Sequence, residues 1–547
     1  MAQAGLVGSK AVSGGSKACD VNPIPADKIA VTQNANVAVM AGAILMCCAC
    51  MWVVSHTSSL PLAMVAAIGF GLFNNTLFSL MHEAVHGMFH GKRSVNEFAG
   101  FVAAAFFPTI FPIQRLSHMT HHKNNRSSVE RFDYYEADDF HFLKVAQWYS
   151  ILTGLYWLFI PVFATVYALF GNLIPWQKLV ATDGTLGRQT SAKPYFESLQ
   201  LIPMWQIRMG FALTLCVQAL MIWGLDLSLW GWAACYVAFG LMWSSLQYAD
   251  HAFSPLDNIK GTWNLRVNGL VRLAYLNYHF HQCHHRDITI PWRFLPEAER
   301  PDDRSIAFKD MLYFMWSGPR LTPGAVIPEH VSRRNNLTVC MFLTAIFCGF
   351  FWIVYGLGDH IHHMAQFRFD LSTGLDRAIP FFPQMAIFYL CISPILLAAP
   401  FVMRSPERLL PFGVALGAEF LIALAVYYMF PVDVPAVAYS KDGLGGALMQ
   451  FADWINLDGN NFPSLHVALV VSAMWAYREF LGRAAYFAGL VLATFVVAST
   501  LLLHQHLLAD VAGGILLAAA GMGFVYPAAR RKLMAIKNEL GEAVNSG

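Results

Sequence analysis

The stretch His281-Gln282-Cys283-His284-His285 carries histidines at its first, fourth and fifth positions, and His118-Met119-Thr120-His121-His122 repeats that spacing. With 20 histidines among 547 residues, chance would give roughly 0.03 copies of the pattern, so two copies need a cause. A related segment, His82-Glu83-Ala84-Val85-His86, puts two histidines on one face of a helical turn. These patterns predict that the three clusters meet at one site.

The composition around the clusters is typical of a membrane protein. Apolar residues make up 56% of the chain and charged residues 13%, and the mean hydropathy is +0.46. A spanning helix needs ~20 mainly apolar residues, because its backbone polar groups find no water in the bilayer. Eleven runs qualify, near 37–54, 60–80, 148–171, 211–229, 231–248, 338–356, 384–403, 410–430, 464–481, 484–503 and 507–527. We therefore expect an all-α, polytopic membrane protein with two helical membrane domains.

Polar segments between the apolar runs predict the domain organisation. The expected order is a polar N-terminal tail (1–36), a histidine-bearing domain (37–330), a linker (331–337), a second membrane domain (338–530) and a C-terminal tail (531–547).

Two apolar stretches are not expected to cross the membrane as single continuous helices. Residues 98–112 contain Pro108 and Pro112 and are expected to re-enter or lie in the interface. The same is expected of 148–171, because the hairpin 211–248 then returns the chain to the face of the earlier histidines. The alternative is that 148–171 lies deeper in the membrane and pairs there with 211–229.

The histidine clusters are interpreted as a metal site. Neutral imidazoles bind iron, zinc, copper and nickel, and a histidine-rich site at a membrane face is costly unless a metal uses the lone pairs. Nine histidines are too many for one ion and fit two, and dioxygen-activating iron is the natural interpretation. The nine are His82, His86, His118, His121, His122, His251, His281, His284 and His285. Glu83, Asp133 and Asp250 are either orienting partners of these imidazoles or solvated carboxylates.

The order H-x-x-x-H, H-x-x-H-H, H-x-x-H-H, with Asn277-Tyr278-His279 before the last cluster and Pro291-Trp292 after it, resembles the membrane fatty acid desaturase superfamily. The resemblance covers residues 37–330 and implies a centre of two iron ions that converts an acyl methylene pair to a double bond. It also implies that His251 completes the ligand set and that Gln247 holds an iron-bound water. A separate ferredoxin or cytochrome would supply electrons.

Two alternatives stay open in this domain. A hydroxylase or ketolase could use the same histidine clusters. His279 competes with His281 as a ligand, although only His281 repeats the spacing of the second cluster.

In the second domain, Phe462-Pro463-Ser464-Leu465-His466 opens one expected helix and His506 precedes another. The hairpin of 464–481 and 484–503 puts both histidines on one face, and Asp510, one turn beyond His506, is close enough to hold its imidazole. This pattern resembles the type 2 phosphatidic acid phosphatase superfamily, especially its inositolphosphorylceramide-synthase-like branch. The resemblance implies that His506 attacks phosphorus, Asp510 orients it, His466 protonates the leaving oxygen and Ser464 helps to hold a lipid phosphate, without a metal.

The second domain departs from this family at two places. Ala436-Val437 stands where the family has Arg-Pro, and Thr500 replaces a common arginine, which removes cationic donors for a phosphoryl group; Lys441 is the obvious cation nearby. The alternatives are therefore head-group transfer or a catalytically degenerate domain. The tract Asp359-His360-Ile361-His362-His363 is interpreted as a solvated loop.

The charge distribution predicts orientation and partners. Lys10, Lys17, Lys28, Lys92 and Arg93 flank the first hairpin, so the positive-inside rule places both termini and the histidine clusters in the cytoplasm and the phosphatase-like site on the opposite face. A net charge of +2 without a basic run beyond helix flanks gives no indication of nucleic acid binding. Lipid acyl chains, lipid phosphate, the membrane and an electron-transfer protein are the expected partners. A non-catalytic metal carrier is disfavoured, because the clusters stand just beyond helix ends.

Overall fold

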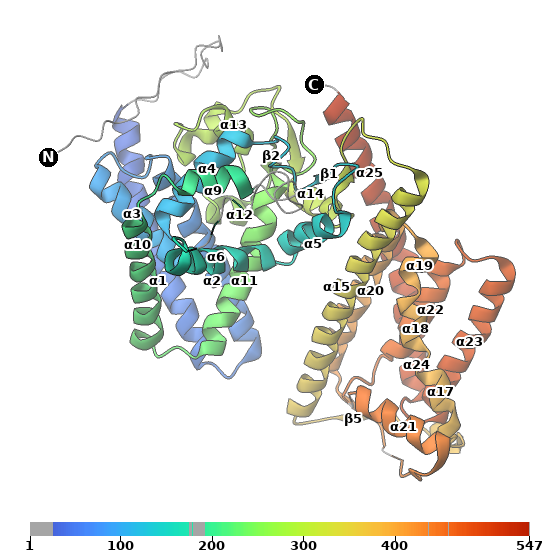
Figure 1. The fold of residues 1–547 in the computed structure, drawn as a ribbon. Coiled ribbons are helices and arrows are strands. Elements are labelled where there is room, and N and C mark those ends of the chain that lie inside the picture. Colours follow the sequence, from blue (N-terminus) through green and yellow to red (C-terminus); the bar gives the residue numbers. More distant parts are fainter. Residues whose placement is uncertain are drawn as a thin grey trace.

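The computed structural model describes residues 26–545, except 174, 176, 177, 179–191, 436 and 458. Lys10, Lys17 and Ala436, on which sequence predictions rest, lie outside the described residues. The described chain forms two helical bundles side by side, which Figure 1 shows in blue to green and in yellow to red. The expected fold class, an all-α polytopic membrane protein, is confirmed.

The N-terminal bundle carries the three histidine clusters. Its elements are α1 (Ala26–His56), α2 (Leu60–Val85), α3 (Arg93–Phe106), α4 (Phe111–Asn124), β1 (Tyr134–Tyr135), α5 (His141–Leu152), α6 (Leu155–Phe170), α9 (Ala192–Leu199), α10 (Met204–Gly224), α11 (Leu229–Ala249), β2 (Asn264–Arg266), α12 (Gly269–Ala274), α13 (His281–Arg286), a 3₁₀ turn (Trp292–Ala298), β3 (Ser305–Ala307), α14 (Phe308–Met315) and β4 (Arg320–Leu321). The parallel pairs β1–β4 and β2–β3 are two or three residues long, and they tie loops above the bundle rather than forming a core.

The C-terminal bundle is built around one long helix. Its elements are α15 (Glu329–Met364), β5 (Phe369–Asp370), α16 (Gly374–Ala378), a 3₁₀ turn (Pro383–Met385), α17 (Ala386–Tyr389), α18 (Ile392–Leu397), α19 (Ala399–Met403), α20 (Pro406–Met429), β6 (Val432–Asp433), α21 (Gly443–Ile455), α22 (Leu465–Tyr477), α23 (Arg483–Leu502), α24 (Leu508–Ala520), a π segment (Gly521–Val525) and α25 (Tyr526–Asn545). The parallel pair β5–β6 joins two loops at its lower end.

Eight described helices are long and apolar enough to span a membrane, fewer than the eleven expected runs. The run 384–403 is broken into α17, α18 and α19, because Pro394 and Pro400 lack the N–H that a continuous helix needs. The run 464–481 gives the 13-residue α22. Apolar composition alone therefore overestimated the number of unbroken spans.

The two stretches expected to re-enter or lie in the interface are bent pairs. Helices α3 and α4 meet at 95°, and α5 and α6 meet at 98°. Polar groups of other helices satisfy the carbonyls exposed at the first bend: Gln218 Nε2 donates to Ala105 O (2.8 Å) and Thr214 Oγ1 to Thr109 O (2.7 Å). At the second bend, Gly154 has φ +78°, and a Cβ there would lie 2.9 Å from the Leu241 backbone nitrogen, so only glycine fits.

Residues 331–337, expected as a linker, instead form the first turns of α15. Pro328 precedes the helix, where a missing N–H costs nothing, and the Arg333–Glu329 pair (2.5 Å) supports the exposed turn. Helix α15 therefore begins before the apolar run 338–356 that the sequence predicts as a span.

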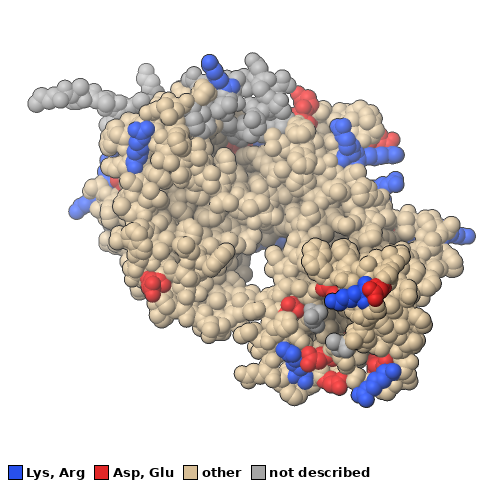
Figure 2. All heavy atoms as spheres, turned by 60° about the horizontal axis from the view of Figure 1, so that its bottom comes forward, with Lys and Arg blue, Asp and Glu red and all other residues tan. Residues whose placement is uncertain are grey.

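Ion pairs join the two bundles at their upper ends. Arg320 Nη1 and Lys537 Nζ both contact Glu407 Oε1, at 2.9 and 2.7 Å, and Lys532 Nζ lies 2.6 Å from Asp310 Oδ2. Figure 2 turns the lower ends forward: the N-terminal bundle shows a broad face almost free of charged residues, whereas charges gather on the C-terminal bundle.

Candidate metal centre and phosphatase site

The first histidine cluster lies at the end of α2. His82 belongs to the last turn of the helix and His86 is its C-cap residue. Asn96 of α3 donates to Ala84 O (2.9 Å), and Arg115 of α4 also reaches this carbonyl (3.2 Å). The end of α2 is thereby held against the two helices that lead to the second cluster.

The second cluster occupies the last two turns of α4. The 95° bend turns α4 across the end of the bundle, and Arg115 forms a two-pronged pair with Glu97 of α3 (2.8 and 3.0 Å). His118 and His122 lie one turn apart and point to the same side as His86: the Nε2 atoms of His118 and His86 are 3.0 Å apart.

His251 follows the C-terminal end of α11 in a loop fixed by a buried ion pair. Arg126 and Asp133 have fully buried side chains with Nη1 and Oδ1 2.8 Å apart. Asp133 also accepts hydrogen bonds from Tyr248 Oη (2.7 Å) and from the Phe253 N–H (2.6 Å). The carboxylate therefore clamps the chain on both sides of His251.

The third cluster lies in the short helix α13. Leu276 and Asn277 precede it with positive φ of 48° and 56°, which turns the chain back toward α2. Thr76 and Ser79 of α2 donate to the carbonyls of Ala274 (2.7 Å) and Tyr275 (3.1 Å). Through these bonds, residues about 200 positions apart in sequence are held side by side.

The structure brings all nine predicted histidines together in two groups, within each of which the ring nitrogens lie within 4.8 Å of one another. The first group is His82, His86, His118, His122 and His284, and the second is His121, His251, His281 and His285. The Nε2 atoms of His122 and His118 are 2.9 Å apart, and those of His281 and His251 are 3.0 Å apart.

Burial keeps the imidazoles outside the membrane-spanning helices neutral. It lowers the pKa of His251, His281, His284 and His285 well below the usual range, and the neighbouring imidazoles lower it further. Neutral imidazole is the state whose lone pair binds a metal. Two sets of convergent ring nitrogens, including those of the four imidazoles that burial keeps neutral, fit two metal ions.

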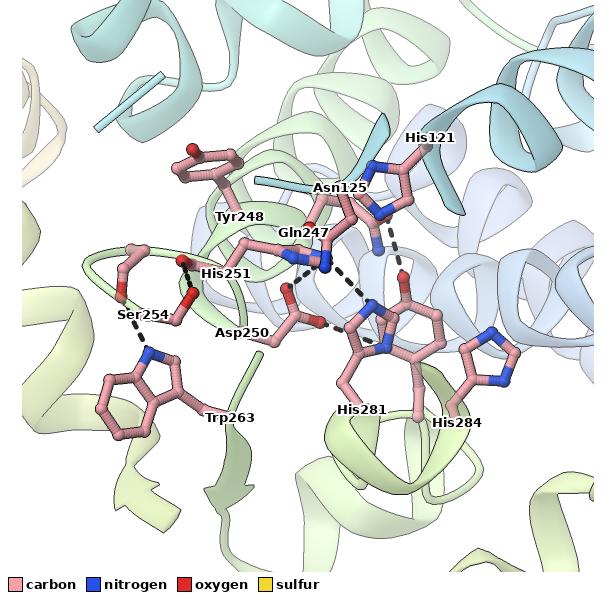
Figure 3. A network of polar contacts seen from close by, with 12 residues as sticks. His121, Asn125, Gln247, Tyr248, Asp250, His251, Ser254, Trp263, His281 and His284 are labelled. Atoms are coloured by element: carbon pink, nitrogen blue, oxygen red, sulfur yellow. Dashed lines mark hydrogen bonds and ion pairs between the residues drawn. The ribbon is translucent and has the colours of Figure 1, made fainter. Parts of the chain in front are cut away.

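Carboxylates lie behind the ring nitrogens of the second group. Asp250 Oδ2 is 3.5 Å from His281 Nδ1, and Asp250 Oδ1 is 3.7 Å from His251 Nε2; Figure 3 shows this carboxylate between the two rings. Glu130 Oε2 lies 3.3 Å from His121 Nδ1, and its other oxygen accepts a hydrogen bond from Tyr195. No periodic pattern in the sequence connects Glu130 with the histidines, so only the fold reveals this contact.

The other sequence candidates take different places. Glu83 accepts a hydrogen bond from the Trp292 N–H (3.3 Å). Gln247 Oε1 accepts one from Tyr278 Oη (3.2 Å), and Gln247 Nε2 is buried without a partner among the described residues. His279 is buried beside Phe280 and joins neither histidine group.

The four predicted residues of the second domain also lie together. The His466 and His506 rings are 5.7 Å apart between centroids. His506 Nδ1 lies 3.5 Å from Asp510 Oδ2, which accepts a hydrogen bond from the Leu507 N–H (2.8 Å). Ser464 caps α22: its backbone N–H donates to Asp510 O (3.0 Å), and its Oγ accepts from the Val467 N–H (3.4 Å).

The departures from the phosphatase pattern have structural counterparts. The Thr500 side chain is buried and donates to Val497 O (2.8 Å), so its hydroxyl is used within α23. Lys441 is exposed just before α21. The tract 359–363, expected as a solvated loop, instead forms the last turns of α15, and His362 is buried. His362 Nε2 lies 3.2 Å from Asp433 and His363 Nε2 lies 3.6 Å from Asp359; the described residues of this tract form no group able to hold a metal ion.

Sequence comparison agrees with this division of the chain. Residues 57–317 match the family model of the fatty acid desaturases, and residues 408–533 match that of the PAP2 superfamily. No curated protein matches the chain. The chain is therefore a fusion of a fatty acid desaturase segment and a PAP2 superfamily segment, as the sequence predicted. Together with its apolar helices, these segments identify a membrane lipid-modifying enzyme.

Proposed function

We propose that the N-terminal bundle is a dioxygen-dependent desaturase of lipid acyl chains that holds two iron ions, and that the C-terminal bundle is a lipid phosphatase with a histidine nucleophile. The observation that carries the proposal is the convergence of nine histidines in two groups, one of five and one of four ring nitrogens. Such nitrogen-rich sites suit iron. Bound iron would supply dioxygen activation, with electrons from a ferredoxin or cytochrome.

The protein's own residues hold and shield this site. Glu130 accepts from the His121 ring N–H, and the Asp250 carboxylate lies 3.5 Å from His281 Nδ1, so the two carboxylates favour the observed orientations of these rings. Burial raises the pKa of Asp250, and a cation at the neighbouring imidazoles would favour its ionised form. The Tyr278 ring lies 5.0 Å from that of His82 and 4.9 Å from that of His281, so it spans the space between the groups and excludes water. Gln247 is placed to hold a water.

Metal analysis and product analysis test this first activity. The purified chain should contain two irons, and cells expressing it should accumulate unsaturated lipid. Oxygenated lipid would instead support a hydroxylase or ketolase. Iron well below two per chain, unchanged by His284→Ala, would rule out the di-iron proposal.

In the C-terminal bundle, the proposed reaction begins at His506. Its Nδ1 faces Asp510, which leaves Nε2 to form a bond with phosphorus. The phosphorus–oxygen bond to the lipid breaks, and its electron pair stays on the oxygen, which takes a proton from His466. Water then attacks phosphorus and gives a proton to His466, which restores that residue; the nitrogen–phosphorus bond breaks with its electron pair staying on His506 Nε2, and free phosphate leaves. Ser464 donates its hydroxyl hydrogen to a phosphate oxygen, and Asp510 stabilises the imidazolium.

Labelled lipid phosphate distinguishes this reaction from its alternatives. Label released as free phosphate supports the phosphatase. Label in a new lipid supports head-group transfer, in which an alcohol replaces water. Label that remains in the substrate supports a degenerate domain.

We also propose that the two sites face opposite sides of the membrane, with both termini cytoplasmic. Helix α15, the segment 383–403 and α20 would make three crossings between His285 and the loop before Ser464. Arginines at the junction between the segment 383–403 and α20, at the turn between α22 and α23 and near the start of α25 then fall on the cytoplasmic side, as the positive-inside rule requires. They are Arg404, Arg408, Arg478, Arg483 and Arg530. Figure 1 supports this arrangement, with α13 near the upper end and α21 at the lower end of the molecule.

A further inference from the structure

Helix α21 lies across the lower end of the C-terminal bundle, where the long helices end (Figure 1). One of its faces is buried: Met449 and Ala452 pack in a cluster with Tyr389 of α17 and Leu503, which follows α23. The helix is therefore a fixed part of the bundle and not a loose connection.

The opposite face of α21 is apolar and uncovered. Leu444, Ala447, Phe451 and Trp454 follow one another at intervals of three, four and three residues, which places them on one stripe of the helix. Leu444 is 75%, Phe451 49% and Trp454 79% exposed. A second apolar stripe opposite the buried one needs a partner that is not water.

The helices against which α21 packs also expose apolar side chains. Beside Tyr389 on α17, Ile387 is 50% exposed, and Phe388 stacks at 4.7 Å on Phe495 of α23, itself 44% exposed. Helix α21 thus packs on a part of the bundle whose neighbouring helices also expose apolar side chains.

Charged residues mark the water side of this surface. Figure 2 shows them gathered on the end of the C-terminal bundle. Those exposed on the loops and on α21 are Arg368, Asp370, Arg377, Asp433, Lys441, Asp442 and Asp453. Aromatic residues, tryptophan above all, favour the boundary between such a charged layer and the hydrocarbon. A lipid surface therefore fits the stripe better than a protein partner does.

Two contacts connect α21 with the phosphatase histidines. Asn456, at the C-cap of α21, donates to Tyr389 Oη (2.7 Å), and the Tyr389 ring stacks on His466 with centroids 4.4 Å apart. Asp453 Oδ1 accepts from Gln505 Nε2 (3.4 Å), next to His506. The depth of α21 in the membrane consequently fixes the depth of both histidines.

We propose that α21 is an interfacial helix whose stripe of Leu444, Ala447, Phe451 and Trp454 lies in the lipid leaflet beside the phosphatase site. The helix holds His466 and His506 at the level of lipid phosphate groups. The substrate class is then a phosphorylated lipid taken directly from that leaflet, not a water-soluble phosphate ester. The substrate class assigned here rests on the proposed phosphatase function, whereas the position of α21 in the leaflet does not.

Photocrosslinking in nanodiscs tests the position of α21 directly. The photoreactive residue p-benzoylphenylalanine inserts into nearby C–H bonds, and mass spectrometry identifies the adduct. In the full-length chain, the probe at position 451 should give phospholipid adducts in at least fivefold excess over the probe at position 450, since Gln450 is exposed but outside the stripe. Equal or absent lipid adducts at the two positions would overturn the proposal.

Kinetics test the link with substrate. For phosphatidic acid in phosphatidylcholine vesicles, Phe451→Gln with Trp454→Gln should raise KM roughly tenfold, because the stripe loses its lipid contact, with kcat unchanged. Activity on the water-soluble ester p-nitrophenyl phosphate should be low in the wild type and equally low in the variant. Trp352→Gln, at a 53% exposed position of α15, is the matched control and should leave KM as it is.

An unchanged KM in the double variant would overturn the substrate assignment. A wild-type chain that modifies no lipid phosphate would instead overturn the proposed function, and the crosslinking result would still decide whether α21 lies in lipid.

Discussion

The two histidine sites of this chain are built in different ways. The nine histidines of the N-terminal site come from four places, the end of α2, the end of α4, the loop after α11 and α13, and buried hydrogen bonds hold these places together. The C-terminal site uses the starts of α22 and α24, and its main pair, His506 and Asp510, is set by four-residue spacing. The proposed metal site, assembled from many segments, depends on the surrounding framework, whereas the proposed nucleophile His506 and its carboxylate Asp510 need little more than a helical turn.

The sharpest test of this comparison inactivates one site at a time, starting with the proposed nucleophile His506. His506→Ala should lower phosphate release roughly 10⁴-fold or more, because the proposed covalent bond to phosphorus forms at His506. Desaturation and iron content should stay at the wild-type level. Assays of both activities on one preparation check this, and a parallel loss of desaturation would show that the sites are not independent.

The converse change should affect only the N-terminal site. His284→Ala removes a ring nitrogen from the group of five and should reduce iron to well below two per chain, with loss of desaturation. Iron is measured by plasma emission spectrometry, and products by gas chromatography of fatty acid methyl esters. His279→Ala is the matched control, because this buried histidine stands outside both groups, and it should retain iron.

The framework around the N-terminal site should be more sensitive than exposed ion pairs elsewhere. Arg126→Ala leaves the buried Asp133 carboxylate without its partner and should destabilise the N-terminal bundle by about 3–5 kcal/mol. Arg333→Ala breaks the exposed pair with Glu329 and should cost about 0.5 kcal/mol or less. Thermal unfolding in detergent compares them, and equal shifts in Tm would refute the contrast.

The smallest of the expected effects concerns the orientation of one ligand. Asp250→Asn keeps the shape of the side chain but weakens its interaction with His281 Nδ1, and should lower metal affinity about 10- to 100-fold. Competition with an iron chelator measures this. Asp257→Asn, at an exposed loop position, should leave the affinity unchanged, and a similar change in both variants would remove Asp250 from the proposed role.

The sequence by itself determined the features that spacing and composition encode. Repeated spacing selected six of the nine histidines, four-residue spacing added His82 and His86, and the family resemblance added His251; all nine join the two groups. His506 and Asp510 were paired because four residues make one helical turn. Apolar composition predicted the membrane class and most spans. Spacing and composition are properties of short stretches, so they can be recognised without knowledge of contacts between distant residues.

Only the tertiary structure decided what depends on distant contacts. Glu130 approaches His121, and Tyr389 stacks on His466, through packing between separate elements, which no periodic pattern records. The bends at Gly154 and between α3 and α4 depend on the helices packed against them, and the polar start of α15 continues the helix where composition predicted a linker. The physical reason is the same in each case: hydrogen bonds and close packing with residues far along the chain override the local preference.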